Sequence, residues 1–114
     1  MAAFFVDLDG TLFNFGTNDF ASNAQEFLSW IKDNNHQLIL TTYRGGDDFK
    51  NHPIFDKDKT LKALKELDVE YDHILFSIVS PRIVINDDPC ASFQVEPNGG
   101  LLDALNLFKR RNYE

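Results

Sequence analysis

Apolar and polar positions follow two patterns along the chain, short apolar runs and longer stretches of helical period. Short apolar runs ended by turn-forming or polar residues are typical of buried strands, and four of them occur, at 4–6, 37–42, 73–76 and 82–85. Apolar residues at intervals of three and four predict amphipathic helices over 20–31, 61–67 and 101–108. A strand, a helix and a strand within about 35 residues form a βαβ unit, whose crossover implies a parallel sheet. The pattern therefore predicts an α/β, three-layer Rossmann-like domain with a central parallel sheet.

Polar residues at the ends of these elements indicate where helices and loops begin. Ser22 or Asn23 is placed to cap the first helix, and Asp58 to cap the second. The stretch 45–58 is polar and acidic, and connections of this length without regular structure are often functional. We expect it to be a surface loop that borders a site. Residues 89–95 predict a short edge strand before the last helix.

Two carboxylates end the first apolar run. Asp7 and Asp9 stand two residues apart and Gly10 follows, so both carboxylates can point the same way at the carboxyl end of a strand. Carboxylates this close repel each other unless a cation lies between them or one is protonated, which predicts a functional site. The alternative is an acidic strand-to-turn junction, because Asp-Gly is a common turn dipeptide. A calcium-binding EF-hand loop is excluded, because it needs an acid at its twelfth position, where Asn18 stands.

Polar residues also end two other predicted strands. Thr42 ends the second apolar run, and Asp87 and Asp88 follow the fourth. Ligands of open parallel sheets bind at the carboxyl ends of the strands, so we expect these residues to lie beside Asp7. Mg2+ prefers oxygen ligands and typically uses one or two carboxylates, with waters and a substrate phosphate, so the pattern predicts a magnesium site. Thr42 has a second interpretation, a strand-end threonine that satisfies a local backbone group.

Composition limits the partners of the chain. The 114 residues, 43% of them hydrophobic with eleven Phe, are enough for one domain, which we place over 1–114. The net charge of −7 argues against nucleic acid as a partner, because such binding relies on Lys and Arg. A single cysteine, Cys90, excludes an intramolecular disulfide and fits a reducing cytoplasm. No segment approaches the roughly 20 apolar residues of a membrane span, and no basic stretch precedes an apolar one at the start. A cytoplasmic protein without membrane contact is expected.

The run Phe-Val-Asp-Leu-Asp-Gly-Thr-Leu at 5–12 resembles the first motif of the haloacid dehalogenase superfamily, whose members are mostly magnesium-dependent phosphatases. The resemblance implies that Asp7 attacks phosphorus and becomes an aspartyl phosphate. It implies that Asp9 protonates the leaving group and then activates water. The chemistry suits these residues, since a carboxylate is a recognised nucleophile in phosphoryl transfer and a second carboxyl group can act as acid and base.

Two further stretches resemble motifs of the same family. Thr42-Tyr43-Arg44 is similar to the Thr-x-Arg form of the second motif in small cap-less members. This implies that Thr42 binds the transferring phosphoryl group, and Arg44 could bond to phosphate or to the rest of the substrate. The acids after the fourth run look like the fourth motif, which implies that Asp87 is a metal ligand supported by Asp88. The first motif would add Asp7 and Asp9 to the metal ligands.

The third motif of the family, a lysine often placed just after the third strand, has no counterpart, because 77–80 read Ser-Ile-Val-Ser. Electrostatic stabilisation of the phosphoryl group carries most of this chemistry, so another cation is expected. Lys59 is the first candidate, because its helix descends from the catalytic edge, and Arg44 is the second. Arg82 is the third, because it begins a predicted strand and would lie roughly 16 Å from the catalytic end.

These features predict a Mg2+-dependent phosphomonoester hydrolase, acting through an aspartyl phosphate on a sugar phosphate, a nucleotide or another bulky phosphorylated substrate. No insertion is large enough for a cap domain, and cap-less members tend to take bulky substrates or to borrow a neighbouring subunit as a lid. A homo-oligomer is therefore a hypothesis. One alternative is a non-catalytic metal- or phosphate-binding module that has lost the third-motif lysine. Another is a response-regulator receiver, which is disfavoured because the third run ends in Phe76-Ser77 and not in an aspartate.

Overall fold

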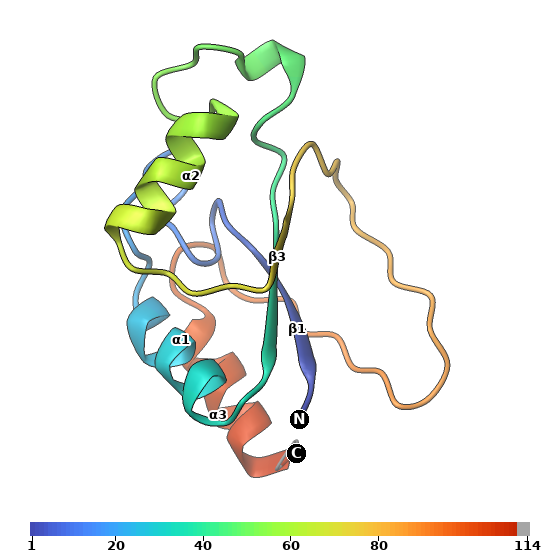
Figure 1. Cartoon of the computed structure of the whole chain (residues 1–114). Helices are drawn as coiled ribbons and strands as arrows, with labels where there is room; N and C mark the ends of the chain where they lie inside the picture. The colour runs from blue at the N-terminus through green and yellow to red at the C-terminus, as the bar shows by residue number, and fades with distance from the viewer. Residues whose placement is uncertain (112–114) are drawn as a thin grey trace.

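The computed structural model describes residues 1–111 and places three helices beside a three-stranded parallel sheet (Figure 1). The elements in chain order are β1 (Ala3–Asp7), α1 (Ala24–Asp33), β2 (Gln37–Thr41), the short 3-10 helix η1 (Asp47–Phe49), α2 (Lys57–Glu66), β3 (His73–Leu75) and α3 (Leu101–Arg111). The predicted α/β class is confirmed. None of the helices in this part of the chain has the length and apolarity of a membrane span.

β2 is the central strand and pairs in parallel with β1 on one side and β3 on the other. The register sets Asp7 opposite Thr41 and Thr41 opposite Leu75. The carboxyl ends of all three strands therefore lie at one edge of the sheet. This register places Asp7 beside the end of β2, as the alternation of strands and helices predicts.

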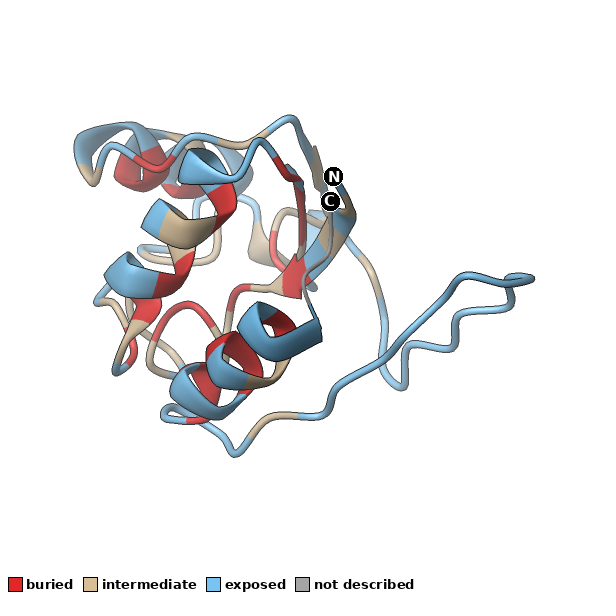
Figure 2. Cartoon of the chain, turned by 90° about the horizontal axis from the view of Figure 1, so that it is seen from below, coloured by how far each residue is buried: buried red, intermediate tan, exposed pale blue. Residues whose placement is uncertain are grey.

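One face of the sheet packs against all three helices. Val6 of β1 and Leu38 and Leu40 of β2 share a core with Phe27 of α1 and Leu105 of α3. Figure 2 shows the buried residues gathered between the helices and the sheet. Each fully buried side chain of this size contributes about 1.5–3 kcal/mol relative to an exposed one, so this layer stabilises the domain.

The other face of the sheet carries no helix within residues 1–111. Phe5 and Leu75 point to that side and are 65% and 44% exposed. The strand order follows the chain order, so right-handed crossovers bring α1 and α2 to the same face. Within residues 1–111 the helices thus lie on one face of the sheet (Figure 1), and a third layer stays a prediction.

Residues 78–96 form neither helix nor strand, and Figure 1 shows them swinging out from the end of β3 before they return to α3. The predicted fourth strand over 82–85 is therefore wrong. Ile83, Val84 and Ile85 are 78%, 69% and 94% exposed and pair with no strand of the described chain. The predicted edge strand over 89–95 is also absent. Pro81 and Pro89 flank the apolar run, and proline has no N–H for a sheet ladder.

The helix caps differ from prediction in one case. The carboxylate of Asp56, not that of Asp58, caps α2 by accepting the N–H of Lys59 at 3.1 Å. Asn23 does occupy the N-cap position of α1, but its side chain makes no capping hydrogen bond. The predicted loop over 45–58 contains η1 and the first two residues of α2.

Candidate functional site

The site begins where β1 ends. Asp7 is the last residue of β1, and the chain then turns back, with the Phe13 N–H donating to the Leu8 carbonyl at 2.8 Å. Gly10 has φ +83°, a left-handed conformation that favours glycine. Leu8 is fully buried while the flanking Asp7 and Asp9 are partly exposed. Leu8 therefore joins the hydrophobic core, whereas Asp7 and Asp9 on either side of it do not.

The carboxylate of Asp7 pairs with Arg82. The guanidinium donates from Nη1 to Asp7 Oδ1 at 3.1 Å and from Nη2 to the Ile78 carbonyl at 3.0 Å. Both side chains of the pair are about a third exposed, 31% for Arg82 and 29% for Asp7. Burial raises the pKa of Asp7 above its ordinary value, the positive charge of Arg82 lowers it, and the negative charge of Asp9 raises it again, with a net rise.

The position of Arg82 corrects the predicted order of cations. The sequence ranks Arg82 last, because a strand over 82–85 would carry it away from the catalytic edge. That stretch is irregular, so Arg82 lies at the carboxyl end of β1 and contacts Asp7. Lys59, placed first, donates its Nζ to the carbonyls of His52 and Asn51 at 3.1 and 3.4 Å. It ties α2 to the preceding loop and pairs with neither carboxylate.

Asp9 pairs with Arg44. Arg44 donates from Nε to both Asp9 oxygens, at 3.2 Å to Oδ1 and 3.0 Å to Oδ2, and from Nη2 to Oδ1 at 2.8 Å. The Arg44 side chain is 1% exposed and that of Asp9 is 15% exposed. This is a buried, charge-assisted, bidentate contact, the strongest kind of side-chain hydrogen bonding. The structure thus directs Arg44 at Asp9, whereas the sequence predicts a contact with the substrate.

Thr42 is fully buried one residue after β2, and its Oγ1 accepts the N–H of Arg44 at 3.1 Å. Its backbone is also occupied, because its N–H donates to the Leu75 carbonyl and its carbonyl accepts the N–H of Ile78. These bonds match the interpretation of Thr42 as a strand-end threonine that satisfies a local backbone group. A contact with phosphate stays a prediction.

Asp87 and Asp88 lie in the exposed stretch 78–96 and are themselves exposed. Within residues 1–111, no three acidic, histidine or cysteine side chains come together as a set of metal ligands. The structure therefore brings Asp7 and Asp9 near each other but leaves Asp87 and Asp88 outside that group. The reason is again the missing fourth strand, which would have carried them to the same edge.

Three residues of the site were not found from the sequence. Asn18, Thr17 and Thr60 accept hydrogen bonds from the Arg44 guanidinium, through the Asn18 side chain at 2.6 Å, the Thr17 carbonyl at 2.7 Å and the Thr60 hydroxyl at 3.2 Å. Each lies in a polar stretch or on a helix where no periodic signal marks it. Their one shared feature is a hydrogen-bonding oxygen, which is too common to identify a site.

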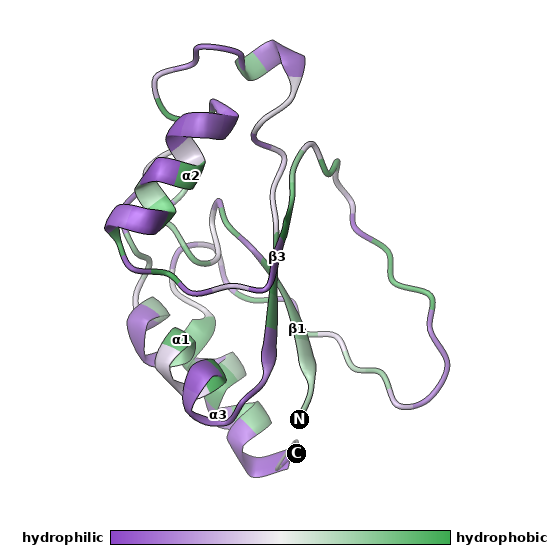
Figure 3. Ribbon diagram, viewed as in Figure 1, coloured by the Kyte–Doolittle hydropathy of each residue, from purple (hydrophilic) through white to green (hydrophobic). Residues whose placement is uncertain are grey.

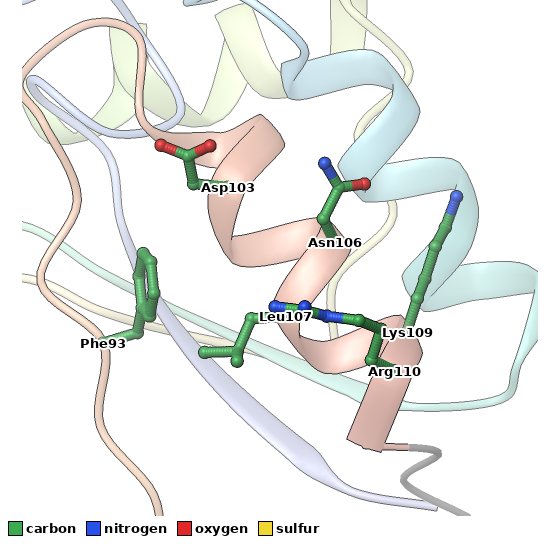
Figure 4. Close-up of a pocket in the computed structure, with 6 residues that line it drawn as sticks. All are labelled: Phe93, Asp103, Asn106, Leu107, Lys109 and Arg110. Carbon is green, nitrogen blue, oxygen red and sulfur yellow. The ribbon is translucent and has the colours of Figure 1, made fainter.

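An open hollow on the surface of α3 lies apart from the two carboxylates (Figure 4). It is lined by Phe93, Asp103, Asn106, Leu107, Lys109 and Arg110. A second hollow lies between α1 and α3 and is lined by residues of those two helices. Neither contains Asp7, Asp9 or their arginine partners, so the candidate site remains the edge of the sheet.

Comparisons with known proteins bear on the fold alone. No protein-family model matches the chain, and no curated protein matches it. A crystal structure described only as an MCSG target from Vibrio cholerae is similar, with a TM-score of 0.57 and 21% sequence identity. The similarity covers 98% of this chain and 100% of that one. It supports the α/β architecture over nearly the whole chain.

Proposed function

We propose that the chain is a phosphomonoester hydrolase that acts through an aspartyl phosphate on Asp7, as a small cap-less member of the haloacid dehalogenase superfamily. The observation that carries the proposal is the paired arrangement at the end of β1. Asp7 and Asp9 stand side by side, and the Arg82 guanidinium lies 3.1 Å from Asp7. A nucleophile, a second carboxyl group and a cation are the groups that phosphoryl transfer needs.

The proposed reaction has two steps. In the first, a carboxylate oxygen of Asp7 attacks phosphorus, the bond from phosphorus to the leaving oxygen breaks, and the Asp9 carboxyl group gives that oxygen a proton. In the second, Asp9 takes a proton from water as the water oxygen attacks phosphorus, which releases phosphate and restores Asp7. Arg82 would neutralise charge on the phosphoryl group in both steps. This assigns to Arg82 the role for which the sequence favoured Lys59.

We include Mg2+ as the cofactor, which the carboxylate of Asp7 and the backbone carbonyl of Asp9 would hold, as the resemblance implies. The two carboxylates repel each other enough that the charge of Asp9 raises the pKa of Asp7, which is a site that a cation would stabilise. One or two carboxylates, completed by waters and a substrate phosphate, are an ordinary donor set for Mg2+. When bound, the ion would supply positive charge against the phosphoryl oxygens. Asp87 and Asp88 stay predicted ligands, outside this pair.

The substrate class follows from the resemblance and stays a proposal. A sugar phosphate, a nucleotide or another bulky phosphorylated compound fits a domain without a cap over the carboxyl edge of its sheet. Thr42 would bind the phosphoryl group. We further propose that the domain has three layers and is cytoplasmic. We also propose that it forms a homo-oligomer, which a measurement of its mass in solution would test.

A non-catalytic module that binds metal or phosphate is the second candidate. One observation favours it: both carboxylates already have guanidinium partners, Arg82 for Asp7 and Arg44 for Asp9. Carboxylates whose charges are already balanced by guanidinium groups suit a site that binds a ligand without turnover. Turnover separates the two candidates.

The experiment is phosphate release from p-nitrophenyl phosphate with and without Mg2+, with Asp7→Asn as the test variant. Asp103→Asn on the exposed side of α3 is the matched control, because it makes the same change of charge away from the site. Turnover that needs Mg2+, survives in the control and is lost in Asp7→Asn supports the hydrolase. Calorimetric Mg2+ binding without turnover, also after trials of bulkier phosphate esters, supports the binding module. Turnover retained by Asp7→Asn overturns the proposed nucleophile.

A further inference from the structure

We propose that Arg44 is a positioning residue, which holds the Asp9 carboxylate in place for proton transfer and does not bind substrate. The inference rests on the proposed function and deepens it. It departs from what the sequence predicts, because Thr-x-Arg pointed to a contact between Arg44 and the substrate. Three observations support the positioning role of Arg44.

The first is the use of the guanidinium donors. An arginine has five N–H donors, one on Nε and two on each Nη. Nε and one Nη2 donor go to Asp9, and the other Nη2 donor goes to the Thr17 carbonyl. The two Nη1 donors go to Asn18 Oδ1 and Thr60 Oγ1. No donor is left for a substrate phosphate, and the side chain is 1% exposed.

The second is the anchoring of the guanidinium plane. The Arg44 Cζ lies 5.4 Å from the centroid of the Phe13 ring and 5.0 Å from that of Phe55. Cations at this distance from aromatic faces are attracted to them. Together with the partners at 17, 18 and 60, these rings fix the guanidinium from two separate segments of the chain, 13–18 and 55–60. The position of Asp9 is therefore set by the folded core.

The third is where Asp9 lies. It follows β1 in a turn, so the strand ladder that holds Asp7 does not hold Asp9. Its Oδ1 accepts two bonds from Arg44, whereas Oδ2 accepts one and keeps a lone pair for a transferred proton. A general acid must lie within hydrogen-bond reach of the atom that it protonates. The Asp9 backbone is held by a bridge to Phe13, and Arg44 supplies the constraint on the carboxylate itself.

The test compares Arg44→Lys with the wild type on two substrates, p-nitrophenyl phosphate and an alkyl phosphate. Lysine keeps the charge but has no planar fork, so the Asp9 carboxylate would lose its fixed orientation. We expect kcat for the alkyl phosphate to fall about 100-fold, the effect of a small misplacement of a reacting group. The p-nitrophenolate burst should persist, because this leaving group needs no proton, and should be followed by slow turnover as the phosphoenzyme waits for its base. KM should change less than about twofold, because Arg44 does not touch substrate.

A double-mutant cycle decides whether Arg44 acts through Asp9. In the Asp9→Asn background, Arg44→Lys should cause little further loss of kcat. A rise of KM with kcat unchanged, or equal losses in both backgrounds, would overturn the inference. If Arg44→Lys does not fold, Asn18→Ala removes one guanidinium partner while keeping the ion pair. It should slow turnover of the alkyl phosphate by a smaller factor and keep the p-nitrophenolate burst, and loss of that burst would count against the inference. If the wild type shows no turnover, the proposed function and this inference are overturned together. If the wild type turns over substrate but the effects of the Arg44 and Asp9 substitutions on kcat are additive, the inference alone is overturned.

Discussion

At the scale of single residues, the two carboxylates differ in how firmly their charges are balanced. The Arg82 side chain is 31% exposed and that of Arg44 is 1% exposed. Exposed ion pairs are weak and screened by salt, whereas breaking a buried pair leaves an uncompensated charge in the interior. A phosphate that enters the site can therefore compete for Arg82 while Arg44 stays with Asp9. The proposed nucleophile, Asp7, has the partner that a phosphate can displace, and the proposed acid, Asp9, has the partner that stays.

Arg82→Gln should move the acid limb of the pH profile of kcat/KM to higher pH. Burial already raises the pKa of Asp7, and Arg82 lowers it, so removing Arg82 raises it further. Attack needs ionised Asp7, so the variant loses activity at a higher pH than the wild type as the solution is acidified. At the optimum we expect a loss of about 10²- to 10³-fold, the usual effect of removing a group that stabilises developing charge.

Arg82→Lys is the matched control for this prediction. It keeps the positive charge beside Asp7, so the acid limb should stay close to that of the wild type. Profiles of initial rates at saturating Mg2+ would measure both variants. An acid limb that does not move in Arg82→Gln would show that Arg82 does not act on the titration of the nucleophile.

The partners of the arginines also show what local sequence cannot predict. Arg44 and Asp9 are 35 residues apart, and Arg82 and Asp7 are 75 apart. The run at 5–12 identifies both carboxylates, because an apolar strand and a glycine turn surround them. Nothing near Arg82 in the chain marks it as a partner of Asp7. Which cation meets which carboxylate depends on how distant segments return, and this is a property of the folded chain.

At the scale of elements, periodicity predicts structure where the element is local and fails where it needs a partner. α1, α2 and α3 each carry an apolar stripe that buries against the sheet, and the first three strands were predicted to within a few residues. The run at 82–85 has the same strand pattern, yet it is exposed and unpaired within the described chain. A strand is stabilised by its neighbours, so its sequence alone does not determine whether it forms.

The N-terminal cap of α2 gives a prediction at this scale, with Asp56 as the test position and Asp58 as its control. Asp56→Ala should lower the thermal midpoint of unfolding, because the Asp56 carboxylate accepts the N–H groups of Lys59 and Asn51, at 3.1 and 2.9 Å. Asp58→Ala, the cap that the sequence predicts, should lower it much less, because Asp58 lies inside the first turn of α2. Thermal unfolding followed by circular dichroism would compare the two. Equal effects would show that the Asp56 bonds do not stabilise the helix.

The capping effect should also depend on pH. Hydrogen bonds from the backbone of Asn51 and then of Lys59 hold the pKa of Asp56 below its ordinary value. The folded state therefore favours the ionised carboxylate, and its contribution is present above the ordinary pKa of an aspartate. It is lost as the pH falls through the lowered pKa. The difference between Asp56→Ala and the wild type should accordingly shrink in acid.

At the scale of the whole molecule, the described chain divides into a packed part and an exposed segment. The helices and the sheet share one hydrophobic core. The segment 78–96 contains hydrophobic stretches, green in Figure 3, and its apolar run at 83–85 is exposed. Within residues 1–111, no backbone-to-backbone hydrogen bond holds 79–95. Segments without such bonds open at little cost in free energy.

Limited proteolysis by thermolysin, which cuts before apolar residues, should therefore begin within 78–96. The cuts should fall before Ile83, Val84, Ile85 or Phe93, because a protease needs extended backbone that is free of hydrogen bonds. Phe27 and Ile31 of α1 are equally apolar but buried, and they serve as internal controls. Fragment masses at short digestion times would identify the first cut. A first cut within α1 or α2, with 83–85 protected, would mean that this apolar run pairs or packs in solution. Asp87 and Asp88, which follow the run, would then lie closer to Asp7 and Asp9 than their exposure indicates.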